Sequence, residues 1–202
     1  MNHPVIIPII IAAALPALIS SSLAARAQAQ SRQEPSSGWH HFGEHRASTV
    51  PASHPFAAME REMYELINRD RAANSSPAGQ PLPPLRWNDQ VAAVARAHSR
   101  DMVSHGYFGH VDPEGRSPGM RLKAAGIVWQ AAGENIATDI SVNRAESAFM
   151  REPPGVRNHR SNILSSKFTE VGVGIAAGPG GELYITQDFM KPAASLRGAF
   201  PR

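Results

Sequence analysis

The chain has 202 residues and a formal net charge of +3, a length suited to one ordinary domain with terminal extensions. It contains no cysteine, which excludes disulfide bonds, zinc–thiolate sites, a lipid-attachment cysteine and a cysteine nucleophile. Its 20 Lys and Arg residues are dispersed rather than gathered into a basic run, and this pattern argues against a nucleic-acid partner.

Residues 1–29 have the order of a secretory signal peptide. Val5–Ile19 is an apolar run of 15 residues, and two overlapping Ala-x-Ala sites follow it within Ala25–Ala29. The run is shorter than the ~20 residues of a membrane span, and Pro8 and Pro16 interrupt it. We therefore predict export, to the periplasm or the exterior, with cleavage at either site. An uncleaved N-terminal anchor is the alternative, because the first residues carry no Lys or Arg.

Residues 30–55 are rich in Ser, Pro and His and show no apolar periodicity, which is typical of a flexible linker. Their four histidines leave a metal-binding tract as the alternative interpretation. We predict that the folded domain covers residues 56–192 and that residues 193–202 form a C-terminal tail.

Two helices are predicted at the start of the domain. Apolar residues recur at helical spacing over Ala57–Ala73 and again after Asn88, which is a suitable N-cap. The second helix is expected to run to about Ser104 and to end before Gly106. His98 lies on its apolar stripe, so we interpret it as a hydrogen-bonded core histidine, with a metal ligand as the alternative.

The sequence pattern in the middle of the chain predicts shorter helices and an extended segment. Ser117 and Pro118 are suited to begin a short helix that Gly126 ends. An extended segment is expected over residues 130–139. A helix over Val142–Met150 follows, and a Pro-Pro-Gly run ends it because proline lacks the N–H donor.

The last third of the domain predicts a short helix and a hairpin. Asn158 can cap the helix, and Glu170–Ala177 and Leu183–Phe189 are β-branched runs joined by a Gly-rich loop. Helices followed by late strands indicate an α+β domain whose antiparallel sheet is covered by helices.

Four side chains stand at the ends of predicted elements rather than in apolar stripes: His110, Glu134, Glu152 and His159. Two imidazoles and two carboxylates can bind a divalent metal, and the same groups can move protons. Spacing in the sequence does not establish that they meet. The alternative is that the glutamates cap helices or form salt bridges and that His159 lies at the surface.

The chain resembles a known family at eight motifs in order: LINRDRAA, LRWNDQVAAVARAHSRDM, YFGH, AAGENIA, AFMREPP, NHRSNIL, FTEVGVGIA and LYITQDF. Together they are similar to the CAP superfamily of cysteine-rich secretory proteins, antigen 5 and pathogenesis-related proteins, in the cysteine-free bacterial SCP-like form. The resemblance covers about Phe56–Met190. It implies a three-layer α-β-α sandwich with a central antiparallel sheet.

The family has a cleft lined by two histidines and two glutamates. The resemblance implies that these are His110 in YFGH, Glu134 in GEN, Glu152 three residues after Phe149, and His159 in NHRSNIL. Phe149 replaces the usual tryptophan, and PPGVRN is inserted between Glu152 and His159. The tetrad can hold a divalent cation such as zinc, so we expect His110 and His159 as metal ligands, with both glutamates lining the cleft.

Three functions remain open from the sequence. The resemblance favours a secreted, monomeric binding module for a lipid, sterol or cell-envelope ligand, with no stable membrane span after cleavage. The alternatives are a hydrolase that depends on a metal or on His and Glu, and a structural envelope protein without catalysis. We assign no catalytic residue and favour a non-enzymatic role, because the residues supply no evident nucleophile.

Overall fold

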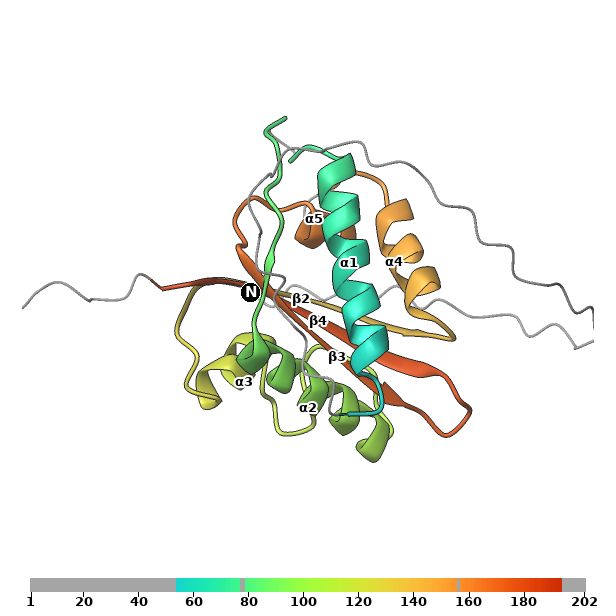
Figure 1. The fold of residues 1–202 in the computed structure, drawn as a ribbon. Helices are drawn as coiled ribbons and strands as arrows, with labels where there is room; N and C mark the ends of the chain where they lie inside the picture. The colour runs from blue at the N-terminus through green and yellow to red at the C-terminus, as the bar shows by residue number, and fades with distance from the viewer. Residues whose placement is uncertain (1–53, 77–78, 156, 194–202) are drawn as a thin grey trace, which may run out of the picture. The chain divides into compact units, whose positions relative to one another are not determined.

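The computed structural model describes residues 54–76, 79–155 and 157–193 (Figure 1). The predicted signal peptide, nearly all of the predicted linker and nearly all of the predicted C-terminal tail lie outside the described residues. The described elements follow in the order α1 (Ala57–Ala73), β1 (Arg86–Trp87), α2 (Asp89–His105), α3 (Pro118–Ala124), β2 (Trp129–Asp139), α4 (Val142–Arg151), α5 (His159–Ile163), β3 (Glu170–Ala177) and β4 (Leu183–Pro192).

The described strands form one sheet in the order β1-β3-β4-β2. The pairs β3–β4 and β4–β2 are antiparallel, and the late hairpin is as the sequence predicts. The two-residue strand β1 lies parallel to β3, which makes the sheet mixed at this edge. Two parallel strands must be joined by a long connection, which here is the whole segment between β1 and β3. A pairing between strands so far apart in the chain cannot be predicted from a local sequence pattern.

Helices cover both faces of the sheet. Figure 1 shows α2 and α3 on one face and α1, α4 and α5 on the other. This arrangement confirms the predicted three-layer α-β-α sandwich. The main apolar cluster fills the space between α1, α4, α5 and the sheet, and a smaller one lies beneath α2 and α3.

The segment VGVG of β3 sets how closely α2 approaches the sheet. A Cβ added to Gly172 would overlap the backbone of α2 at Ala92, and one added to Gly174 would overlap the backbone at Arg96. Glycine at both positions therefore lets the helix backbone lie directly on the strand.

Helix ends follow the predicted chemistry. The side chain of Asn88 accepts hydrogen bonds from the backbone N–H groups of Gln90 and Val91, and Gly106 ends α2 in the left-handed conformation at φ 65°. Asn158 and Ser161 form a capping box at the start of α5. In α3, by contrast, Ser117 occupies the N-cap position without a side-chain cap bond.

Several charged side chains are buried, although charged residues usually lie at the protein surface. Glu60 of α1 is fully buried and receives two hydrogen bonds from Arg96 Nε, at 3.0 and 2.9 Å, and one from Nη2 at 2.7 Å. Arg71 donates to the backbone oxygens of Ile163 and Ser165 at 2.7 and 2.9 Å, which ties α1 to the end of α5. Burial lowers the pKa of Arg71 to about 10, so the guanidinium stays charged at neutral pH.

Candidate functional site

His110 and Glu134 form the first of two histidine–glutamate pairs. His110 lies in the loop between α2 and α3, and its Nδ1 is 2.8 Å from Oε1 of Glu134 on β2. The glutamate side chain is 1% exposed, whereas the imidazole is 37% exposed. The buried carboxylate therefore holds a ring whose other edge reaches solvent.

Arg121 of α3 fixes both members of this pair. Its Nη2 donates to Oε2 of Glu134 at 2.5 Å, and its Nη1 donates to the backbone oxygen of His110 at 2.9 Å. The guanidinium thus supplies the positive charge that a buried carboxylate needs as a partner. The site is held from α3 as well as from the sheet.

His98 lies next to the first pair as a core residue. Its side chain is fully buried, its Nε2 is 3.1 Å from the backbone oxygen of Gly109, and it stands 3.8 Å from Oε2 of Glu134. Burial is the largest influence on its pKa and lowers it, so the ring is neutral at neutral pH. This placement is the one the apolar stripe predicts.

Glu152 and His159 form the second pair across the Pro-Pro-Gly insertion. Nδ1 of His159 is 2.6 Å from Oε1 of Glu152, and the backbone N–H of His159 donates to Oε2 at 2.8 Å. The insertion closes on itself because Asn158 Nδ2 donates to the backbone oxygen of Pro153 at 2.8 Å. The ring of Phe149 lies 4.5 Å from that of His159, so phenylalanine supports the imidazole at the position where the family usually has tryptophan.

Two asparagines connect the pairs. Asn162 Nδ2 of α5 donates to the backbone oxygen of Glu134 at 3.1 Å and to Asn135 Oδ1 at 2.8 Å. Asn135 Nδ2 donates in turn to the backbone oxygen of His159 at 3.1 Å and to Gln187 Oε1 at 2.9 Å. This amide network joins β2 to α5 and sets the position of one pair relative to the other.

The four predicted site residues therefore form two pairs rather than one close cluster. Within the described residues, no three of them bring ligand atoms within 4.8 Å of one another, whereas Asp101, Asp112 and Glu114 do. In each pair Nδ1 of the histidine faces a carboxylate, which leaves Nε2 as the ring atom that can bind another group. Both oxygens of each glutamate already accept hydrogen bonds, so the glutamates orient the histidines.

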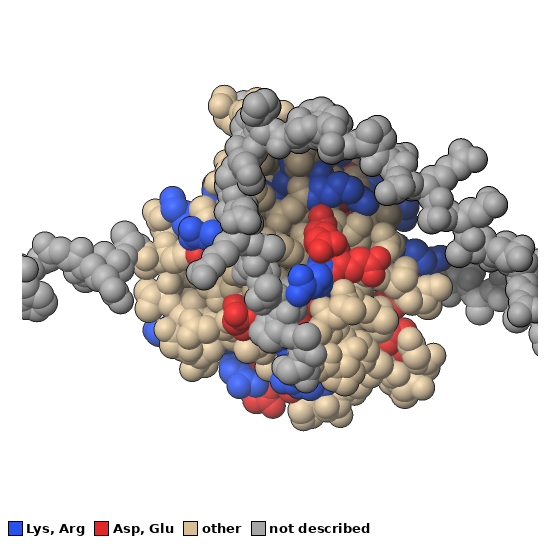
Figure 2. Space-filling model, viewed as in Figure 1, with Lys and Arg blue, Asp and Glu red and all other residues tan. Residues whose placement is uncertain are grey.

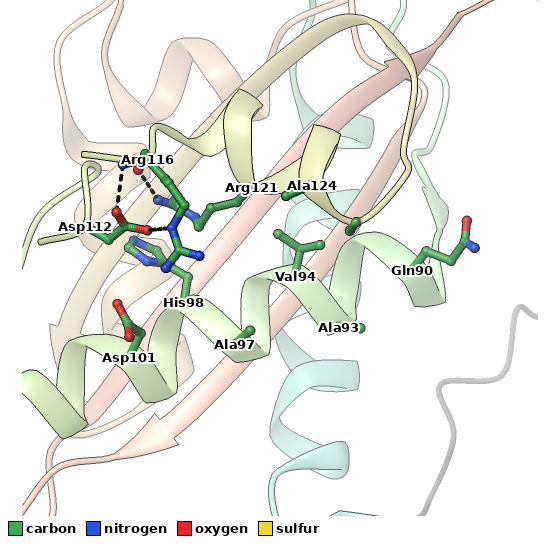
Figure 3. A pocket seen from close by; sticks show the side chains of 11 residues that line it. Gln90, Ala93, Val94, Ala97, His98, Asp101, Asp112, Arg116, Arg121 and Ala124 are labelled. Carbon is green, nitrogen blue, oxygen red and sulfur yellow. Dashed lines mark hydrogen bonds and ion pairs between the residues drawn. The ribbon is translucent and has the colours of Figure 1, made fainter. Parts of the chain in front are cut away.

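Two hollows open on the α2–α3 side of the sheet. One, of about 420 Å³, lies between α3 and β2 and has Glu134 in its wall, with exposed Met120 and Trp129 among its other lining residues. The other, of about 480 Å³, runs between α2 and α3 (Figure 3). Small side chains such as Ala93 and Ala97 line one end, and the charged groups drawn in Figure 3 gather at the other.

The surface in Figure 2 shows Lys and Arg side chains interspersed with Asp and Glu where the described residues form it. On the face that Figure 2 shows, the described Lys and Arg residues form no continuous basic patch. In addition, none of the helices in the described part of the chain combines the length and the apolar character that a membrane span needs.

Residues 64–189 match the family model described as the cysteine-rich secretory protein family, CAP. This chain belongs to the CAP family. The Bacillus subtilis (strain 168) protein YkwD is 34% identical over 127 residues, which cover 63% of this chain and 46% of YkwD. The membrane protein YlbC of the same organism is 33% identical over 132 residues, which cover 65% of this chain and 34% of YlbC. The CAP chain thus spans less than half the length of these relatives.

Solved structures agree with the assignment to the CAP family. An extracellular protein containing an SCP domain from Bacillus anthracis str. Ames is 31% identical, with a TM-score of 0.57, over 66% of this chain and 40% of that one. An outer surface protein from Borrelia burgdorferi has a TM-score of 0.60 at 16% identity, over 69% of this chain and 96% of that one. The second likeness concerns the fold alone.

Sequence reasoning missed the residues that support the two pairs. From the sequence, Arg121 is expected at the surface of a short helix, and nothing distinguishes Asn135 and Asn162 from other polar residues. The segment LYITQDF likewise gave no signal that Gln187 and Asp188 are buried, because polar residues in a strand are ordinarily assigned to its solvated face.

Proposed function

We propose that this CAP domain is exported and binds a lipid, sterol or other cell-envelope ligand at the His/Glu cleft, without catalysis. The observation that carries the proposal is the pair of anchored imidazoles: each Nδ1 is fixed by a carboxylate, so each Nε2 is held ready for a polar group of a ligand. The hollow beside Glu134, with Trp129 and Met120 exposed in its wall, supplies apolar contact area for the rest of the ligand. The extracellular relative from Bacillus anthracis supports the location.

A divalent cation such as zinc fits the donor chemistry of this cleft. Nε2 of His110 and Nε2 of His159 would hold it, and the two glutamates would orient the rings from behind, as carboxylates commonly do behind zinc-bound histidines. When bound, the ion would supply a positive centre for the oxygen atoms of a ligand headgroup. Two imidazoles do not complete a tetrahedral shell, so water or ligand oxygens would fill the remaining positions.

Thermal denaturation with and without zinc tests the metal. Zinc at 100 times its dissociation constant should stabilise the folded chain by about 2.7 kcal/mol and raise the melting temperature. The His110→Ala/His159→Ala double variant should lose the increase. His105→Ala is the matched control, because this histidine is 55% exposed on α2 and belongs to neither pair. An undiminished increase in the double variant would rule out metal binding by His110 and His159.

The ligand is tested by mass spectrometry of lipid extracted from the purified chain and by binding to isolated envelope fractions. Trp129→Ala should weaken envelope binding by about tenfold or more, since a buried tryptophan contact is commonly a hot spot. Val128→Ala is the matched control, because Val128 is adjacent and 73% exposed but does not line the hollow. No co-purified lipid together with no envelope binding would favour a structural role.

A further inference from the structure

Asp188 lies in the sheet directly beside Glu134. The two residues are partners in the antiparallel register of β2 and β4, and Gly172 of β3 is the partner of Asp188 on its other side. Gly172 faces the backbone of α2, and Glu134 reaches Arg121 of α3. Because directly opposite residues share a face of the sheet, Asp188 points into the same layer, beneath α2 and α3.

Within the described residues, no cation forms a hydrogen bond with Asp188; the charge of Arg121 lowers the pKa of this carboxyl, but by less than burial and Glu134 raise it. The residue is fully buried, and within the described part of the chain neither of its carboxyl oxygens accepts a hydrogen bond. The cationic and polar groups of this layer make their hydrogen bonds elsewhere: Nη1 and Nη2 of Arg121 to Glu134 and to backbone oxygens, His110 to Glu134, and His98 to the backbone oxygen of Gly109. The remaining donor, Nε of Arg121, is buried and forms no hydrogen bond to Asp188.

Two ionised carboxylates cannot be accommodated side by side here. An unpaired buried charge costs several kcal/mol, and a second negative charge adjacent to the first raises that cost. Burial, followed by the charge of Glu134, raises the pKa of Asp188 well above its usual range. A protonated carboxyl has a donor of its own, and the neighbouring Glu134 carboxylate can accept from it.

We propose that Asp188 is a positioning residue of the cleft, a buried carboxylic acid that donates a hydrogen bond to the Glu134 carboxylate. Glu134 is then held by three donors from three directions: His110, Arg121 and Asp188. The third donor stops the carboxylate from turning, and the carboxylate in turn fixes the ring of His110. The inference deepens the proposed function and rests on it only for the role of His110 in the cleft.

Two substitutions of Asp188 distinguish the effect of its hydrogen-bond donor from the effects of its charge and its volume. Asp188→Asn is neutral and keeps an N–H donor, whereas Asp188→Val is neutral and of similar size but has no donor. The measurement is the pH midpoint of the His110 ring, followed by NMR in metal-free protein. The midpoint should be unchanged in Asp188→Asn. In Asp188→Val it should rise by roughly half a pH unit, because a Glu134 with one donor fewer attracts imidazolium more strongly.

Other outcomes overturn the proposal. If Asp188 were ionised, both substitutions would remove a negative charge, and both would lower the midpoint. An unchanged midpoint in Asp188→Val would show that Asp188 does not position Glu134. If Asp188→Val does not fold, the carboxyl carbon shift of Asp188 in the unsubstituted chain decides, because it should stay at the protonated value well above the pH range in which an aspartate ordinarily ionises. None of these measurements uses a ligand or a metal, so the inference and the proposed function can fail separately.

Discussion

Glu146 of α4 should make the stability of this domain depend on pH. Its side chain is buried against the sheet, where one oxygen accepts a hydrogen bond from Gln187 Nε2 at 2.7 Å and the other has no partner within the described residues. Burial raises its pKa from 4.5 to about 8. The group is therefore mostly a neutral acid at pH 7 in the folded chain and a carboxylate in the unfolded one.

The direction in which stability changes with pH follows from the number of protons that Glu146 binds in each state. Between pH 4.5 and pH 8 the folded state holds one proton more than the unfolded state at this residue, so stability falls as pH rises. Each pH unit costs about 1.4 kcal/mol, and the interval from pH 4.5 to pH 7 therefore costs about 3 kcal/mol. Glu146→Gln is neutral at every pH and keeps the acceptor for Gln187, so it avoids this loss.

Urea denaturation of both proteins from pH 4 to pH 7 measures the effect. The two should be nearly equal at pH 4, and Glu146→Gln should be more stable by about 3 kcal/mol at pH 7. Taking the difference between the proteins cancels the contribution of every other titrating group. Glu65→Gln, on the exposed face of α1, is the matched control for removing a solvated carboxylate. A difference that stays constant with pH would refute the conclusion that Glu146 is protonated in the folded state.

Two further predictions concern packing and buried charge. Gly174→Ala should cost about 3 kcal/mol or prevent folding, because the added methyl group overlaps the backbone of α2. Thermal denaturation should show a normal transition for the control Gly155→Ala, where the added Cβ would lie 3.5 Å from Asn158 Nδ2; equal melting temperatures would contradict the close packing. Arg96→Met should cost about 3 kcal/mol by urea denaturation, since it removes the guanidinium that donates to buried Glu60 and leaves only His54 and the backbone N–H of Ile175 beside that carboxylate. Arg86→Met removes an ion pair whose arginine is 73% exposed and should cost less than about 1 kcal/mol; similar losses for both would show that burial of the first pair is unimportant.

Local rules predicted most of the elements. Apolar spacing located α1, α2 and α4, and breakers such as Gly106 marked where helices end, because these signals lie within a few residues of one another. The strand β1 was not predicted, since a two-residue strand has no periodicity of its own. Its existence depends on β3, far along the chain.

The sequence named candidate site residues but did not predict how they are arranged. The family motifs pointed to His110, Glu134, Glu152 and His159, and the structure shows which histidine pairs with which glutamate. The charges buried around them could not be foreseen. Patterns assign Asp188 or Glu146 to solvent by default, and only the strand register and the helix packing place them inside.

The two glycines of β3 also bear on how this molecule can move. With no side chain between them, α2 and β3 have no compressible layer that would let one slide past the other. The wall that α2 contributes to the 480 Å³ hollow is therefore rigid. The opposite wall belongs to the seven-residue helix α3, flanked by the loop that carries His110. Changes in the width of the hollow thus require motion of α3, and because Arg121 joins this helix to Glu134, we expect such motion to shift the pair formed by Glu134 and His110.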